Sequence, residues 1–126
     1  MDPTKTPGAF SWNELSTPDP ETAGRFYAGL FGWTVKNMDM GTGPYHVASV
    51  GDTQVCGIMA LPPEAGPMPP AWGCYITVAD VAATEAQCAA LGGKTLVPAM
   101  DVPGVGRMAV LQDPQGAVFS VMAYSA

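Results

Sequence analysis

Residues 17–35 read TPDPETAGRFYAGLFGWTV, and residues 78–96 repeat the pattern as VADVAATEAQCAALGGKTL. A shift of 61 positions places Asp19 on Asp80, Leu30 on Leu91 and Gly32 on Gly93. Each copy has an acidic helix cap, an amphipathic helix, a glycine stop and an aliphatic strand. Internal repetition identifies a duplicated module. We therefore expect any functional site to lie where the two modules face each other.

The flanking sequence extends each copy to the order strand, helix, three strands. In the first copy the strands are expected at residues 9–16, 33–38, 45–50 and 53–61, and in the second at 72–78, 94–97, 107–112 and 117–124. Residues 98–106 are expected to form a long loop, either a plain connection between strands or a lid that Gly104 and Gly106 would let move. Apolar positions at helical spacing predict the buried helix faces, namely Ala23, Phe26, Tyr27 and Leu30 in the first helix and Val81, Thr84, Cys88 and Leu91 in the second.

The length of 126 residues predicts one domain of the α+β class. We place the first module at about residues 9–61 and the second at about residues 72–124. Between them, residues 62–71 are rich in proline and form the predicted linker, because proline fits neither a helix interior nor a central strand.

Composition excludes several classes of function. A net charge of −6 with only five basic residues argues against nucleic-acid binding. The sequence contains no run of about 18 apolar residues that would predict a membrane span. Its first residues lack the pattern of a secretory signal, so we expect a cytoplasmic location. Cys56, Cys74 and Cys88 have no metal-ligand spacing, which favours small buried side chains over a disulfide or zinc site.

Three stretches together resemble the vicinal oxygen chelate superfamily, which includes glyoxalase I, extradiol dioxygenases and bleomycin-resistance proteins. They are ELSTPDPETAGRFYAGLFGW, the pair YHVASVG and VCGIMAL, and GRMAVLQDPQGAVFSVM. The resemblance implies tandem βαβββ modules, each curled into a half-barrel of mixed sheet, which enclose a cup. It also implies a homodimer. In the enzymes of the superfamily a divalent ion is held in the cup by histidine, glutamine or glutamate side chains.

The superfamily's four metal positions fall on Trp12, Gly57, Gly73 and Ser120 in this chain. None of these side chains is an imidazole, carboxylate or thiolate donor for a divalent ion. A register slip of one residue would offer only Asn13, Cys56, Cys74 and Phe119, and would turn each strand to its other face. We therefore expect no metal and no other cofactor.

The residues left on the cup-facing strand positions predict an apolar pocket with a few polar points, suited to a small organic molecule. The candidate ligand-binding residues are Trp12, His46, Gly57, Met59, Gly73, Thr77, Ser120 and Met122. Glu14 and Tyr75 are the candidate catalytic residues, because a carboxylate in an apolar site can serve as a general acid or base and a phenol can donate a hydrogen bond. Purely structural roles for these residues stay open, because Trp and Met side chains also fill ordinary cores and Glu14 could be solvated.

Three functions follow from these residues. The first is a metal-free protein that binds a hydrophobic or aromatic molecule, as bleomycin-resistance proteins sequester their ligand. The second is a metal-independent isomerase or lyase that uses Glu14 as acid or base. The third is a glyoxalase- or dioxygenase-like metalloenzyme whose metal site the sequence does not reveal. Whether the chain is an enzyme is left open at this point.

Overall fold

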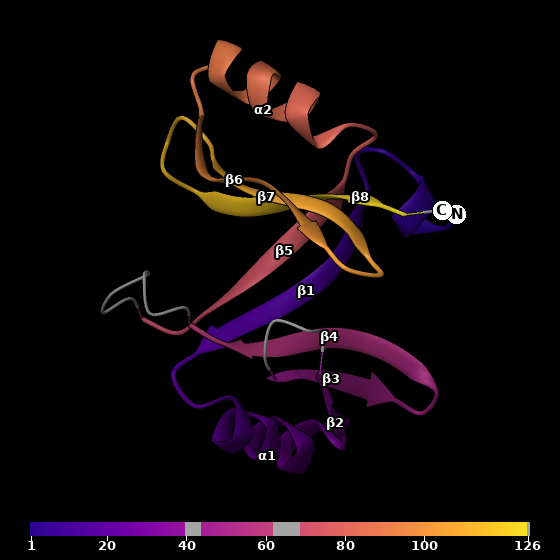
Figure 1. Ribbon diagram of the computed structural model, residues 1–126. Helices are drawn as coiled ribbons and strands as arrows, with labels where there is room; N and C mark the ends of the chain where they lie inside the picture. The colour runs from indigo at the N-terminus through magenta and orange to yellow at the C-terminus, as the bar shows by residue number, and fades with distance from the viewer. Residues whose placement is uncertain (40–43, 62–68, 126) are drawn as a thin grey trace. The chain divides into compact units, whose positions relative to one another are not determined.

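A computed structural model describes residues 1–39, 44–61 and 69–125 of the chain. After a short 3-10 helix, Pro3–Lys5, the order strand, helix, three strands occurs twice, which confirms the predicted α+β class (Figure 1). The first set is β1 (Phe10–Thr17), α1 (Pro20–Phe31), β2 (Thr34–Asp39), β3 (Pro44–Val50) and β4 (Thr53–Ala60). The second is β5 (Ala71–Thr77), α2 (Val81–Ala90), β6 (Lys94–Val102), β7 (Gly106–Gln112) and β8 (Val118–Tyr124). The predicted linker lies largely outside the described residues.

Internal contacts divide the chain into two compact units, residues 12–73 and residues 1–11 together with residues from 74 onward. We call them the first and the second unit. Within the first, the hydrogen-bonded strand order is β2-β3-β4-β1, and within the second it is β6-β7-β8-β5. The pairs β1/β4 and β5/β8 are parallel and the others are antiparallel. Each unit is therefore a small mixed sheet with one helix on it.

Both helices begin where the sequence predicts, because an aspartate accepts the first free backbone N–H groups. The Asp19 carboxylate accepts from the Thr22 amide at 3.1 Å, and Asp80 accepts from the Ala83 amide at 3.0 Å. Gly32 ends α1 with a φ of 74°, in the left-handed region that glycine reaches without strain. Local sequence therefore determines the helix boundaries.

The predicted helix faces are only partly correct. In α1 the one buried residue is Gly24, which brings the helix backbone close to Val35, whereas Phe26 and Leu30 are 59% and 60% exposed. In α2, Val81 is buried, but Leu91 is 69% exposed. The side of each sheet that faces its helix is apolar. In the second unit it contributes Ala109, Leu111 and Val121, which pack with Val81 as the core.

The predicted lid loop at residues 98–106 is wrong. Strand β6 continues to Val102, so only residues 103–105 connect it to β7. A register irregularity between Val97 and Met100 occurs at Pro98, and β6 is the edge strand of the sheet, where proline is tolerated. Arg107 Nε lies 3.1 Å from Asp101 Oδ1, and this ion pair joins the ends of these two strands. Among the described residues, no helix is long and apolar enough to cross a membrane.

Candidate functional site

The sheet face of the first unit that points away from α1 carries a group of polar and aromatic side chains. Strand register places Glu14 beside Gly57, and Gly57 beside Val47 on β3. Side chains alternate along a strand, so residues two positions apart lie on the same face. Trp12 therefore shares the face of Glu14, and Tyr45 shares the face of Val47. Three strands thus bring aromatic rings and one carboxylate together.

Two hydrogen bonds connect these side chains through Tyr45. The Tyr45 hydroxyl donates to Glu14 Oε2 at 2.6 Å and accepts from Trp12 Nε1 at 3.0 Å. We call Trp12, Tyr45 and Glu14 the phenol network. All three side chains are half-buried. The hydroxyl serves as donor and acceptor at once, so the indole, the phenol and the carboxylate hold one another in position.

Gly57 lies directly beneath this network. A Cβ atom built on Gly57 would run into the hydroxyl and ring carbons of Tyr45. The phenol therefore rests against bare backbone, and a side chain at position 57 would displace it. A glycine at position 57, where the resemblance implies a metal ligand, thus leaves room for the Tyr45 ring.

The surroundings of Tyr45 keep its hydroxyl protonated. Burial raises the pKa of Tyr45 above its ordinary value, the neighbouring Glu14 carboxylate raises it further, and the Trp12 hydrogen bond opposes both. A protonated phenol beside a carboxylate is a fixed hydrogen-bond donor. The network accordingly offers charge and hydrogen bonds at set positions on an otherwise apolar face.

The candidate residues of the second unit have different surroundings. Tyr75 is only 6% exposed, pairs with Ser120 across β5 and β8, and points its hydroxyl at Met108 Sδ, 3.8 Å away. Thr77 is 3% exposed and donates to the Pro3 carbonyl at 2.7 Å, which fixes the chain's first residues to β5. These contacts give Tyr75 and Thr77 structural partners within the second unit.

The structure brings together three of the predicted site residues. Trp12, Glu14 and Gly57 meet at the phenol network, and Met59 follows Gly57 on the same face of β4. A Cβ on Gly73 would lie 3.9 Å from the Glu14 carbonyl oxygen, so this glycine is close to the Glu14 backbone. Met122 is buried on β8, where it pairs with Met108.

His46 lies on the opposite side of its strand from the phenol network. Its neighbour Tyr45 takes the Glu14 face, so strand alternation turns His46 toward the α1 side. Sequence reasoning selected His46 because it is the single histidine, and it passed over Tyr45. The feature that could have identified Tyr45 is the contact between its ring and Gly57 on the neighbouring strand. That contact depends on the register between the two strands, which the sequence alone does not determine.

The residues that the family resemblance puts at the metal positions offer no imidazole, carboxylate or thiolate to a divalent ion. In the first unit the positions that the resemblance implies hold an indole and a glycine, and the nearby Glu14 carboxylate already accepts a hydrogen bond from the Tyr45 hydroxyl. Across the described part of the chain, no group of three or more His, Cys, Asp or Glu side chains is placed to hold a metal ion. Structural zinc or iron sites need several such donors.

The chain belongs to the glyoxalase-like domain family, whose model matches residues 13–122. It is 45% identical over 116 residues to CFP32 of Mycobacterium tuberculosis, whose name provisionally calls it a glyoxylase. It is 38% identical over 128 residues to the anthracycline biosynthesis protein DnrV of Streptomyces peucetius. Each match covers 91% of this chain but only 44% and 46% of those relatives, so the chain spans less than half their length.

Solved structures confirm the glyoxalase, bleomycin-resistance and dioxygenase fold. Methylmalonyl-CoA epimerase from M. tuberculosis superposes with a TM-score of 0.66 at 14% identity, covering 94% of this chain and 89% of that one. An extradiol ring-cleaving dioxygenase from B. fuscum superposes with a TM-score of 0.63 at 18% identity, covering 93% of this chain and 32% of that one. At these identities the likeness concerns the fold alone.

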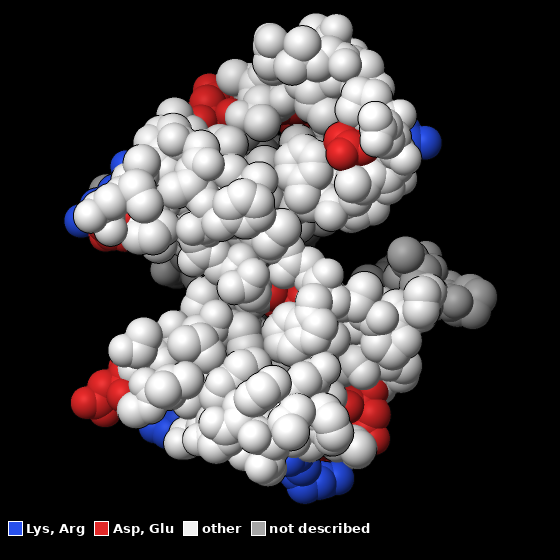
Figure 2. All heavy atoms as spheres, turned by 180° about the vertical axis from the view of Figure 1, so that it is seen from behind, with Lys and Arg blue, Asp and Glu red and all other residues white. Residues whose placement is uncertain are grey.

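The charged side chains are sparse on one face of the molecule. On the face in Figure 2, Lys, Arg, Asp and Glu form isolated spots separated by broad uncharged areas. A nucleic-acid footprint would need Lys and Arg gathered along one side. On this face the Lys and Arg side chains do not gather into such a footprint.

Proposed function

We propose that this glyoxalase-like chain binds a small hydrophobic or aromatic organic molecule without a metal ion. The observation that carries the proposal is the phenol network, Trp12–Tyr45–Glu14, placed over Gly57 at a family metal position. Ligand sites of this kind combine apolar walls with a few fixed polar groups. Trp12 supplies a flat ring, Met59 a deformable thioether, and the network supplies orientation.

Rigidity of the network supports recognition of one ligand geometry. The Tyr45 hydroxyl has its proton engaged by Glu14 and one lone pair engaged by Trp12. Groups whose directions are already fixed lose little entropy when a ligand arrives, which favours affinity and selectivity. A ligand with an aromatic body and one polar group would use both the rings and this polar centre.

The short contact between Glu14 and Tyr45 favours a second candidate function, a metal-independent isomerase or lyase. A carboxylate 2.6 Å from a phenol forms an acid–base pair that can accept a proton from bound substrate. In that case Glu14→Gln would abolish turnover while binding stays largely intact. In the binding function, the compound is recovered unchanged.

Thermal-shift screening of aromatic and polycyclic compounds against the full chain tests the proposal. A ligand at a hundred times its dissociation constant should stabilise the fold by about 2.7 kcal/mol. Tyr45→Phe should lower the affinity for that ligand. The matched control is Tyr124→Phe, which removes a hydroxyl bonded to Ser11 at 2.8 Å in the second unit and should leave the affinity unchanged. Mass spectrometry of the recovered compound then separates binding from turnover. Equal affinity of both variants would refute the proposed site.

A further inference from the structure

The second unit contains a hollow beside α2, on the helix-covered side of its sheet. Its volume is about 640 Å³, which is within the range of sites that hold small organic molecules. Leu91, Leu111 and Phe119 contribute apolar wall, and the carboxylates of Asp80 and Asp113 also line it. We call it the α2 hollow. All its lining residues belong to the second unit, so it is separate from the phenol network.

The internal repeat explains why the second unit has room at this place. The first unit has a hollow at the matching position beside α1, and its volume is only about 400 Å³. A shift of 61 residues places Phe26 on Gln87 and Tyr27 on Cys88, and these residues line the two hollows. The second unit therefore replaces two aromatic rings by smaller side chains. The larger space comes from its own sequence, because the same fold also permits the rings.

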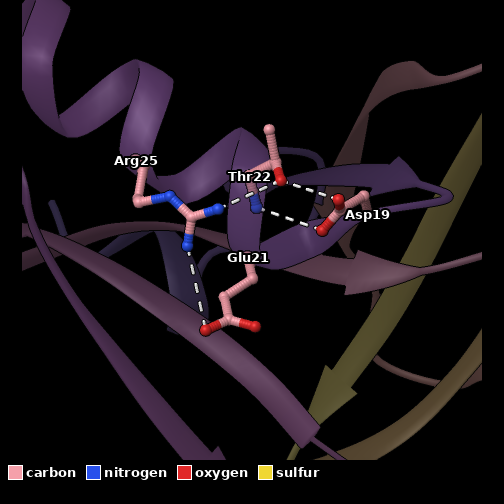
Figure 3. Close-up of polar contacts among 4 residues, drawn as sticks. All are labelled: Asp19, Glu21, Thr22 and Arg25. Atoms are coloured by element: carbon pink, nitrogen blue, oxygen red, sulfur yellow. Dashed lines mark hydrogen bonds and ion pairs between the residues drawn. The ribbon is translucent and has the colours of Figure 1, made fainter.

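The polar side chains at the start of α1 are bonded to one another. The Thr22 hydroxyl donates to Asp19 Oδ2 at 2.6 Å and accepts from Arg25 at 3.2 Å (Figure 3). Arg25 also pairs with Glu21 at 3.8 Å. The positions that match Glu21, Thr22 and Arg25 are all alanine in α2, namely Ala82, Ala83 and Ala86. The second helix therefore keeps the capping carboxylate without the hydroxyl and the guanidinium that accompany it in the first.

Two carboxylates give the α2 hollow its charge. Asp80 Oδ1 accepts from the Ala83 amide at 3.0 Å. Asp113 Oδ1 accepts from the amides of Gln115 and Ala117 at 2.9 and 3.0 Å. Within the described part of the chain, neither aspartate forms an ion pair. A bare helix start would favour an anionic ligand, but Asp80 already caps α2, so the charge at this place is negative.

We infer that the α2 hollow binds a small organic cation, an ammonium group on an aromatic or aliphatic body. The body would lie against Leu91, Leu111 and Phe119, where burial of apolar surface supplies affinity. The ammonium group would be attracted by the carboxylates of Asp80 and Asp113. The net charge of −6 favours the approach of a cation and opposes that of an anion. This site and its ligand class are distinct from those proposed for the phenol network.

Isothermal titration calorimetry of the full chain tests the inference with two probes, naphthylethylamine and the neutral naphthylethanol of nearly equal size. The amine should bind at one site per chain and at least about fivefold more tightly than the alcohol. The double variant Asp80→Asn, Asp113→Asn keeps the side-chain oxygens that accept the backbone amides. It should remove the preference for the amine while the alcohol binds as before.

Ala83→Phe tests the location, because Ala83 lines the α2 hollow and a ring there would fill it. This variant should weaken amine binding at least about tenfold. The matched control is Ala86→Phe, which places the same ring at an exposed position of α2 outside the hollow and should leave the affinity unchanged. Circular dichroism reports whether either variant disturbs folding.

Alkylation of Cys88 gives a readout that needs no substitution. Cys88 lines the α2 hollow, so saturating amine should slow its reaction with iodoacetamide, followed by peptide mass spectrometry. The inference is overturned if the amine does not bind at millimolar concentration, if amine and alcohol bind equally, or if Cys88 reacts at the same rate with and without amine. Equal weakening by Ala83→Phe and Ala86→Phe also overturns it. So does binding that Tyr45→Phe lowers and Ala83→Phe does not, because the amine would then lie at the phenol network.

Discussion

Removing one oxygen atom from Tyr45 should destabilise the protein measurably. Tyr45→Phe deletes the donor to Glu14 and the acceptor of Trp12 while keeping the ring that lies over Gly57. A hydrogen bond to a charged group contributes about 1.5–3 kcal/mol and a neutral one about 1 kcal/mol. Because Glu14 and Trp12 are half-buried, water recovers part of this sum, which leaves a loss of about 2 kcal/mol.

Chemical and thermal unfolding measure this loss. For a chain of 126 residues, about 2 kcal/mol corresponds to a fall in Tm of roughly 7 °C. Tyr124→Phe is the control of identical chemistry, since its hydroxyl bonds Ser11 at 2.8 Å without a charged partner there. It should cost about 1 kcal/mol. If Tyr45→Phe proves as stable as Tyr124→Phe or more so, the phenol network contributes nothing special to the fold.

Alkaline pH should reveal the same network. Burial and the Glu14 carboxylate raise the pKa of Tyr45 above its ordinary value of 10.0, so the folded chain keeps a proton that the unfolded chain loses. The stability from this group is therefore complete below pH 10 and decreases as the pH rises beyond it, by up to about 1.4 kcal/mol per pH unit. The difference between wild type and Tyr45→Phe should shrink over this range. A constant difference would contradict the assignment.

Three further substitutions, the first with a matched control, test other parts of the structure. Gly57→Ala should lower the free energy of unfolding in urea by about 2–4 kcal/mol, because its Cβ would displace Tyr45. Gly73→Ala, whose Cβ would make only one ordinary contact, should lower it by less than about 1 kcal/mol. Equal losses in the two variants would contradict this explanation. Gly29→Ala, in α1 with no atom near the added Cβ, should stabilise the protein by about 0.5–1 kcal/mol, and a loss of stability would show that the position is constrained. Asp19→Asn keeps the helix cap but removes a carboxylate whose pKa is lowered by the hydrogen bonds from Thr22. Thermal melting below pH 3.8 should therefore show a smaller loss of stability in this variant than in the wild type. The same loss in both would argue against a stabilising role of the Asp19 charge.

The repeat predicted most of the fold because its signals are local. Asp19, Asp80 and Gly32 define helix ends through contacts within a few residues, and the structure confirms all three. The extent of β6 was missed because Pro98 reads as a strand breaker unless its strand is known to lie at a sheet edge. Position in a sheet depends on distant segments, which a local pattern does not specify.

The candidate site was predictable only in part for a related reason. Alternation and the family resemblance identified Trp12, Glu14 and Gly57, which the structure brings together. Tyr45 was missed, although it joins them, because its role depends on the register between β3 and β4. The exposure of the α1 rings was also missed. Helical periodicity gives the apolar side of a helix, but it does not tell whether the same chain covers that side.

Metal analysis tests most directly whether the first unit binds its ligand without a metal ion. The chain is purified without chelators from medium that contains iron, zinc, nickel and manganese. With an indole and a glycine at family metal positions and Tyr45 over Gly57, elemental analysis should find every divalent transition metal well below one ion per chain. One tightly held ion per chain, lost together with Glu14 in Glu14→Gln, would contradict a metal-free binding site.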